Sequence, residues 1–133
     1  IRDRIYIRIY PARMNIVWVF IGGGVGAACR WAVSKTFEAG VQFPFATLTV
    51  NLVGCFLIGL VYFFSIKIHN PWYLIGVVGF LGGFTTFSSY SLELMKMLEY
   101  GFHKNFIIYF LASNILGVLL VYTGYKAGSY WLS

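Results

Sequence analysis

A short run of residues combines paired glycines with hydroxyl side chains in the middle of an apolar segment. Gly82 and Gly83 are followed closely by Thr85 and Thr86, and then by Ser88. Backbone that leaves helical geometry at membrane depth must have its freed carbonyl and amide groups satisfied by protein, water or an ion. The pattern therefore predicts an ion site that is built from main-chain oxygen atoms, and it indicates transport.

A second polar pair lies in the apolar stretch that precedes these glycines. Thr47 and Asn51 are four residues apart, so they share one face of a helix. A side-chain amide at the centre of a membrane costs free energy unless it has a partner. Two interpretations of Asn51 stay open. It binds a neighbouring helix and holds the bundle together, or it lines a wet pathway and offers its NH₂ hydrogens to an anion.

The segment that follows the glycines resumes a helical pattern. Thr86, Tyr90 and Glu93 fall on one stripe, and Phe87 and Tyr90 present two rings at adjoining positions. Such a ring pair usually serves packing, but the hydroxyl-rich surroundings favour a pathway here. Glu93 either forms an interfacial ion pair with Lys96 or lies at the mouth of the pathway, and the sequence leaves both open.

Polar positions also occur in the first and last apolar stretches. Tyr109, Ser113 and Gly117 share a face of the last stretch, where Ser113 either bonds the carbonyl one turn earlier or continues a hydroxyl track. Arg30 follows a glycine-rich segment, residues 22–26, whose small residues predict close helix packing. Arg30 either snorkels to the interface or lines an aqueous vestibule that attracts anions.

Four apolar stretches must position these residues. They cover roughly residues 15–34, 46–66, 72–92 and 105–125, and each has about the 20 residues that a membrane-spanning helix needs. Of the 133 residues, 59% are hydrophobic and 11% charged, whereas about a quarter of a soluble domain is charged. We therefore expect an all-α membrane protein in which residues 14–133 form one four-helix transmembrane domain. Residues 1–13 form a basic arm to which we assign no function.

The net charge of +6 does not indicate nucleic acid, because the basic residues lie in the arm, near span ends or in short loops. Cations at those places contact lipid headgroups and bias the orientation of the chain. Without the arm, the side of the membrane that holds the N-terminus carries two basic residues and the opposite side carries four. With the arm, the N-terminal side carries six and the opposite side still carries four. This weak bias permits insertion in both directions and leaves the topology open.

Three segments carry a resemblance that runs from about Met14 to the end of the fourth stretch. They are AACRW at 27–31, PFATLTVNLVG at 44–54 and, most specifically, GGFTTFSSYSLE at 82–93. Together they resemble the Fluc (CrcB) family of small fluoride channels. The resemblance implies four-helix subunits in the cell membrane, each with a third helix broken near its centre. It also implies an antiparallel, dual-topology homodimer with two fluoride pores and a central sodium ion, which both subunits bind through main-chain carbonyls.

By position, the resemblance also implies roles for individual residues. The sodium carbonyls would belong to Gly82 and Thr85. Tyr90 departs from the family, which has a phenylalanine there, and its hydroxyl either donates to the anion or changes how the ring edge faces it. Gly117 departs as well, because the family often has a serine there. The remaining roles fall on the pore aromatics Phe87 and Tyr90, the polar-track residues Asn51, Tyr109 and Ser113, the vestibule arginine Arg30 and the pore-end carboxylate Glu93.

Physical chemistry is consistent with a fluoride pathway at these residues. Fluoride is small and strongly hydrated, so a pore must replace its lost water with a dense set of donors. The amide of Asn51 and the hydroxyls of Thr86 and Ser113 are suitable donors, and the edges of aromatic rings carry positive charge. Conduction requires favourable entry together with weak holding at several sites. We expect passive export of fluoride, with a sodium ion that is structural and not transported.

Two rival functions stay open. A small four-span multidrug or cation exporter relies on a carboxylate in its first span, and residues 15–34 contain neither Asp nor Glu. A non-conducting membrane assembly subunit would have no pathway of its own. The sequence shows no activated nucleophile, phosphate loop or metal cluster, and we therefore predict that the chain is not an enzyme.

Overall fold

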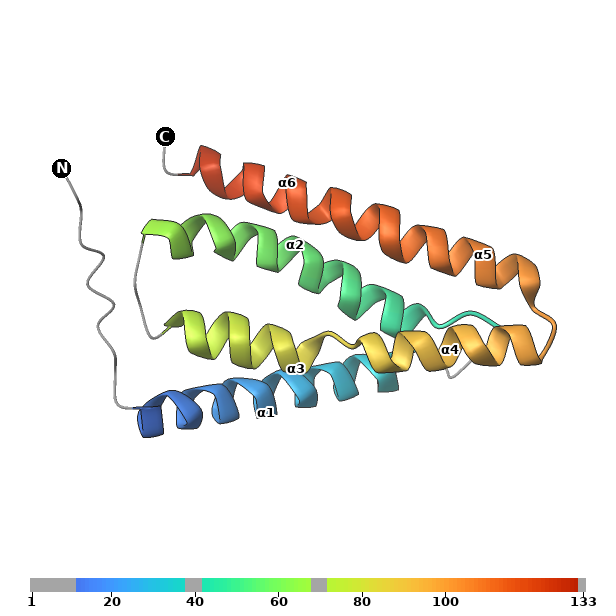
Figure 1. The fold of residues 1–133 in the computed structure, drawn as a ribbon, viewed down its shortest axis with the longest axis horizontal. Helices are drawn as coiled ribbons and strands as arrows, with labels where there is room; N and C mark the ends of the chain where they lie inside the picture. The colour runs from blue at the N-terminus through green and yellow to red at the C-terminus, as the bar shows by residue number, and fades with distance from the viewer. Residues whose placement is uncertain (1–11, 38–41, 68–71, 132–133) are drawn as a thin grey trace.

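The computed structural model describes residues 12–37, 42–67 and 72–131, and all regular structure within these ranges is helical. Figure 1 shows the helices lying lengthwise beside one another. The prediction for arm residues 1–11 lies outside the described residues, whereas Ala12 and Arg13, which we had assigned to the arm, belong to the first helix. The elements are α1 (Ala12–Thr36), α2 (Phe45–Lys67), η1 (Leu74–Leu81), α3 (Gly82–Phe84), α4 (Phe87–Glu99), α5 (His103–Leu111), η2 (Ala112–Leu116) and α6 (Gly117–Tyr130).

Four stretches of helix are long and apolar enough to cross a membrane, which confirms the all-α expectation with four spans. They are Ile16–Thr36, Phe45–Tyr62, Leu74–Glu99 and His103–Tyr130. The third and fourth spans are longer than their apolar stretches. Met97 explains part of the difference, because it lies beyond the apolar stretch and is nevertheless only 2% exposed, packed in one cluster with Tyr109. Burial against a neighbouring helix thus extends the third span past the stretch predicted from the sequence, residues 72–92.

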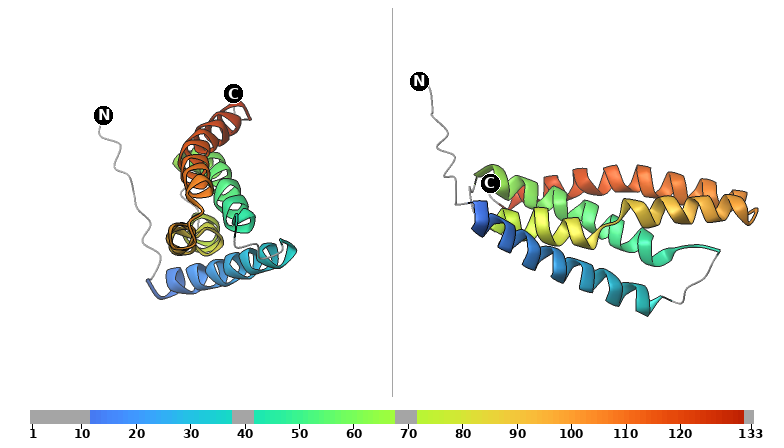
Figure 2. Two further views of the ribbon diagram at one scale, coloured as in Figure 1. Left: turned by 90° about the vertical axis from the view of Figure 1, so that its right-hand side faces the viewer. Right: turned by 60° about the horizontal axis from the view of Figure 1, so that its bottom comes forward.

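The four spans pack in two pairs, α1 along η1 and α3, and α2 along α6. The two views in Figure 2 show this pairing, with α1 lying on one side of the bundle. Glycines make the closest contacts. A Cβ on Gly22 would meet the carbonyl oxygen of Ile75, and a Cβ on Gly26 would meet that of Phe80. The small residues of the first span therefore serve helix packing, as their spacing predicts.

Between α3 and α4, the backbone of the third span is extended. Thr85 has φ −84° and ψ 159°, and Thr86 has φ −150° and ψ 119°. Thr86 is the N-cap of α4, and its hydroxyl oxygen accepts a hydrogen bond from the backbone amide of Ser89. The residues on either side are helical, so the extended conformation is confined to two residues near the middle of the span (Figure 1).

We predict that the glycine contacts between α1 and the third span limit the stability of the fold. Gly22→Ala or Gly26→Ala should destabilise the protein by about 1–3 kcal/mol, because the added methyl group meets backbone that has no room to move. Gly24→Ala is the matched control, since a Cβ at Gly24 meets nothing within 4 Å. Thermal unfolding in detergent measures the difference. Equal thermal unfolding midpoints for all three variants would contradict a role of Gly22 and Gly26 in the packing of α1 against the third span.

Candidate functional site

The side chain of Asn51 on α2 holds the extended backbone of the third span. Its Nδ2 donates to the carbonyl oxygen of Thr86 at 3.0 Å, and its Oδ1 accepts from the amide of Thr86 at 2.8 Å. The side-chain amide therefore pairs with both backbone groups of one residue, as a neighbouring peptide would. Of the two interpretations of Asn51, these contacts favour interhelical binding, although one Nδ2 hydrogen remains for another acceptor.

The same contacts redirect two amides that an unbroken helix would use for its own carbonyls. The amide of Thr86 would donate to the carbonyl of Gly82, but it donates to Asn51 instead. The amide of Ser89 would donate to the carbonyl of Thr85, but it donates to the hydroxyl of Thr86 at 3.2 Å. Gly82 and Thr85 are thus among the residues at this helix end whose carbonyls lose their regular helical donors.

The carboxylate of Glu93 on α4 is held by hydroxyls from two other spans. Thr47 of α2 donates to its Oε1 at 2.6 Å, and Tyr109 of α5 donates to its Oε2 at 2.8 Å. Thr47 is 8% exposed and Tyr109 is completely buried. Within the described residues, no ion pair joins Glu93 to Lys96. Glu93 therefore belongs to an internal polar cluster, and these two bonds do not support the alternative of an interfacial ion pair with Lys96.

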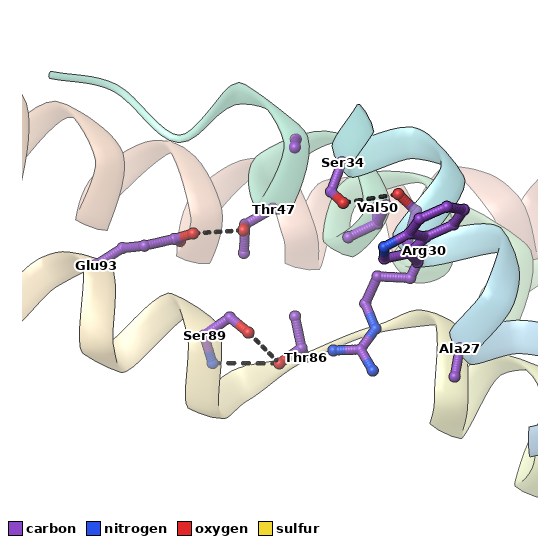
Figure 3. Close-up of a pocket in the computed structure, with 10 residues that line it drawn as sticks. Ala27, Arg30, Ser34, Thr47, Val50, Thr86, Ser89 and Glu93 are labelled. Carbon is purple, nitrogen blue, oxygen red and sulfur yellow. Dashed lines mark hydrogen bonds between the residues drawn. The ribbon is translucent and has the colours of Figure 1, made fainter. Parts of the chain in front are cut away.

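Arg30 lines a cavity beside this cluster. The cavity has a volume of about 370 Å³, and residues from three spans line it. Figure 3 shows the Arg30 side chain extending from α1 toward Thr86, while Glu93 enters the same space from the other side. Among the described residues, the buried Nε atom of Arg30 has no hydrogen-bond partner. This position fits the vestibule interpretation better than snorkelling to the interface.

The two rings that sequence spacing brings together face different surroundings. Phe87 is 79% exposed on the single chain, whereas Tyr90 is 7% exposed. Their centroids are 5.8 Å apart and their planes are tilted by 45°. Tyr90 also meets the ring of Tyr109 edge to face, with centroids 5.2 Å apart. One aromatic residue of the pair thus packs inside the bundle, whereas the other lies on the surface of the single chain.

The predicted track along the last span is only partly assembled. Tyr109 joins the cluster through Glu93, but Ser113 does not. The hydroxyl oxygen of Ser113 is buried and has no hydrogen-bond partner in the part of the chain that the structure describes, so the bond to the carbonyl one turn earlier does not form. Ser113 lies in η2, where π-helical geometry changes the rotation between successive side chains. The sulfur of Cys55 lies 3.4 Å from where a Cβ on Gly117 would stand.

Sequence reasoning missed Asn114, which follows Ser113 directly. Its Nδ2 donates to the hydroxyl oxygen of Tyr90 at 3.0 Å and to the carbonyl of Phe110 at 2.7 Å. A polar amide inside an apolar span was a visible signal, since such a group needs a partner. Its partner could not be seen, because Tyr90 lies on another helix and faces Asn114 only in the folded chain.

A bundle of four apolar helices that encloses polar side chains at membrane depth is the arrangement expected of a membrane transport protein. The chain belongs to the family described as "CrcB-like protein, Camphor Resistance (CrcB)", which matches residues 17–125. This confirms the resemblance seen in the sequence. With its four spans, the chain is a multi-pass protein of the cell membrane.

Relatives match over almost their whole length. The chain is similar to proteins named "Fluoride-specific ion channel FluC" from several bacteria. The one from Aquifex aeolicus is 40% identical over 123 residues, which cover 86% of this chain and 98% of that protein. The one from Magnetococcus marinus is 40% identical over 120 residues, with the same coverage, and the one from Phocaeicola vulgatus is 36% identical over 114 residues, covering 83% and 94%. These relatives are named as ion channels and not as enzymes.

We predict that the hydroxyl of Tyr109 stabilises the bundle through Glu93. Tyr109→Phe should lower stability by about 1–3 kcal/mol, because it leaves a partly buried carboxylate with one hydroxyl donor fewer. Tyr122→Phe is the matched control, because Tyr122 is 58% exposed and lies outside the cluster. Its effect should stay within about 0.5 kcal/mol. Equal thermal midpoints for the two variants would show that the bond to Glu93 contributes nothing.

Proposed function

We propose that this protein is a fluoride-selective channel that exports fluoride passively across the cell membrane. The observation that carries the proposal is its similarity, at 40% identity over 98% of their length, to two proteins named fluoride-specific ion channels. Such complete coverage includes every span and every polar residue of the candidate site. The alternative of a multidrug or cation exporter gains no support from these relatives.

The chemistry of the polar cluster supports an anion as the transported ion. Thr47 and Tyr109 already donate hydrogen bonds to the two oxygens of one carboxylate, so both hydroxyls are directed at an anionic group. Asn51 keeps one amide hydrogen that its bond to Thr86 does not use. Arg30 supplies positive potential at the adjoining cavity. Donors of this kind replace the hydration shell that fluoride loses, and Thr86, Ser113 and the ring edges of the aromatic pair extend the path.

We propose further that two copies assemble antiparallel and complete the pathway between them. The single chain leaves Phe87 79% exposed next to the extended residues, and Gly82 and Asn114 are exposed on it as well. An exposed phenylalanine beside polar backbone is expected where a second protein surface covers it. The weak charge bias between the two sides of the membrane permits the opposite insertion that an antiparallel homodimer requires.

A structural sodium ion at the centre of this dimer fits the backbone of the third span. Gly82 and Thr85 have carbonyls whose regular helical donors are engaged elsewhere. Two from each copy make four oxygen ligands, and hard cations prefer such ligands. Gly82 is exposed on the single chain and a Cβ there would meet nothing within 4 Å, so a partner has room to approach this residue. A sodium ion bound there would hold the two interrupted spans together.

Fluoride efflux tests the function directly. Proteoliposomes loaded with fluoride should release it rapidly through the wild-type protein, as a fluoride electrode records. Asn51→Asp should be nearly silent, because the carboxylate loses the donor to Thr86 and its charge repels the anion. Asn105→Asp is the matched control, since Asn105 binds the carbonyl of Gln42 outside the cluster, and its efflux should equal that of the wild type.

Two results would contradict this account at different levels. Wild-type efflux from Asn51→Asp would remove Asn51 from the pathway. A folded, dimeric wild-type protein that releases no fluoride would overturn the function itself.

The proposed sodium site predicts a sodium-dependent stability. Replacing sodium by N-methylglucamine should lower the thermal midpoint of the wild-type protein, because an ion that binds only the assembled state stabilises it. Gly82→Leu should abolish this dependence, because the added side chain fills the open space beside Gly82 that the partner would occupy. Gly24→Leu is the control, because Gly24 is equally open on the single chain but lies on α1. Fluoride-coupled uptake of sodium into liposomes would contradict a structural role.

A further inference from the structure

Asn114 binds the hydroxyl of Tyr90 in a defined orientation. Its Nδ2 lies 2.7 Å from the carbonyl oxygen of Phe110 and 3.0 Å from the Tyr90 hydroxyl oxygen. A carbonyl oxygen only accepts hydrogen bonds, so the nitrogen end of the Asn114 amide must be the end that faces Phe110. The same nitrogen faces Tyr90. The two hydrogens of the amide are thus donated to these two oxygens.

This orientation determines where the proton of Tyr90 points. Because the hydroxyl oxygen accepts from Asn114, its own hydrogen must be directed away from the amide. In the described part of the chain, no acceptor takes this hydrogen. A hydroxyl that accepts one hydrogen bond is also polarised and donates a stronger one. Tyr90 is therefore left with an unused donor at membrane depth.

The ring that carries this hydroxyl is held in place on several sides. Tyr90 is 7% exposed and meets Tyr109 edge to face at 5.2 Å, while Phe87 lies 5.8 Å away on the same helix. These contacts hold the body of the ring, and Asn114 holds its hydroxyl end. Asn114 itself is exposed on the single chain, so the hydroxyl lies next to the surface that the proposed dimer would cover.

We propose that Asn114 is a positioning residue that makes Tyr90 a hydroxyl donor to the transported anion. This inference rests on the proposed fluoride channel and names a selectivity determinant within it. A fixed O–H group favours a small anion of high charge density, so it should stabilise fluoride more than chloride. Without Asn114, the hydroxyl is free to rotate, and its preference between the two anions falls.

A double-mutant cycle tests the proposal in proteoliposomes. The four proteins are the wild type, Asn114→Leu, Tyr90→Phe and the double variant, and the readout is the ratio of fluoride to chloride efflux. Asn114→Leu should lower this ratio by about fivefold when Tyr90 is present, the equivalent of about one net hydrogen bond. In the Tyr90→Phe background, the same substitution should leave the ratio unchanged, because no hydroxyl remains to be positioned.

Controls separate positioning from folding. Thr123→Val removes a hydroxyl that bonds the carbonyl of Leu120 on α6, away from Tyr90, and should leave the ratio at the wild-type value. If Asn114→Leu does not assemble, Asn114→Ser replaces it, since a hydroxyl is too short to bind both oxygens. A purely structural role would reduce fluoride and chloride efflux in equal proportion and leave their ratio unchanged.

The outcomes distinguish this inference from the function on which it rests. A ratio that falls only in the presence of Tyr90 supports the proposal. A ratio that falls equally in both backgrounds, or in neither, overturns it while the wild type still conducts fluoride. A wild-type protein that conducts no fluoride overturns the proposed function, and the inference with it.

Discussion

The pairing of the Asn51 side chain with both backbone groups of Thr86 is the interaction on which the rest of the site depends. Extended backbone inside a membrane has polar groups that lipid cannot satisfy, and each would cost several kcal/mol, on the order of an unmade hydrogen bond in an apolar medium. Asn51 removes that cost at Thr86 by acting as a substitute peptide. The amide of Ser89 is satisfied in the same region by the hydroxyl of Thr86. The interruption is thus stabilised by side chains from two spans.

The extended residues also create two helix ends of opposite polarity inside one span. The carbonyl end of η1 and α3 carries partial negative charge, and the amide end of α4 carries partial positive charge. A cation is favoured at the first end and an anion near the second. This arrangement allows a bound sodium ion and a fluoride pathway to lie close together without sharing ligands. It gives a physical basis for proposing both ions in one small chain.

Glycine and aromatic residues mark two kinds of surface on the chain, one that packs inside the bundle and one that is open on the single chain. Backbone of the third span occupies the space beside Gly22 and Gly26, so the face of α1 that carries these glycines serves internal packing. Gly82 and Phe87, in contrast, face open space on the single chain. The polar cluster of Glu93, Thr47 and Tyr109 lies inside, between spans of one chain. The second copy proposed above would add to the polar cluster that one chain already forms.

The sequence by itself determined the four membrane spans and the family, because apolar length and the segment at residues 82–93 are local features of the chain. It also indicated most of the polar residues that the fold brings together, but not their partners. Glu93 binds Thr47 and Tyr109, and Asn114 binds Tyr90. Within the described residues, Glu93 forms no ion pair with Lys96, and the hydroxyl of Ser113 has no hydrogen-bond partner. Only the tertiary structure decided these contacts. Helical spacing shows which residues share a face of one helix. How these faces are rotated toward one another depends on the extended residues 85–86 and on the π-helical turn in the last span.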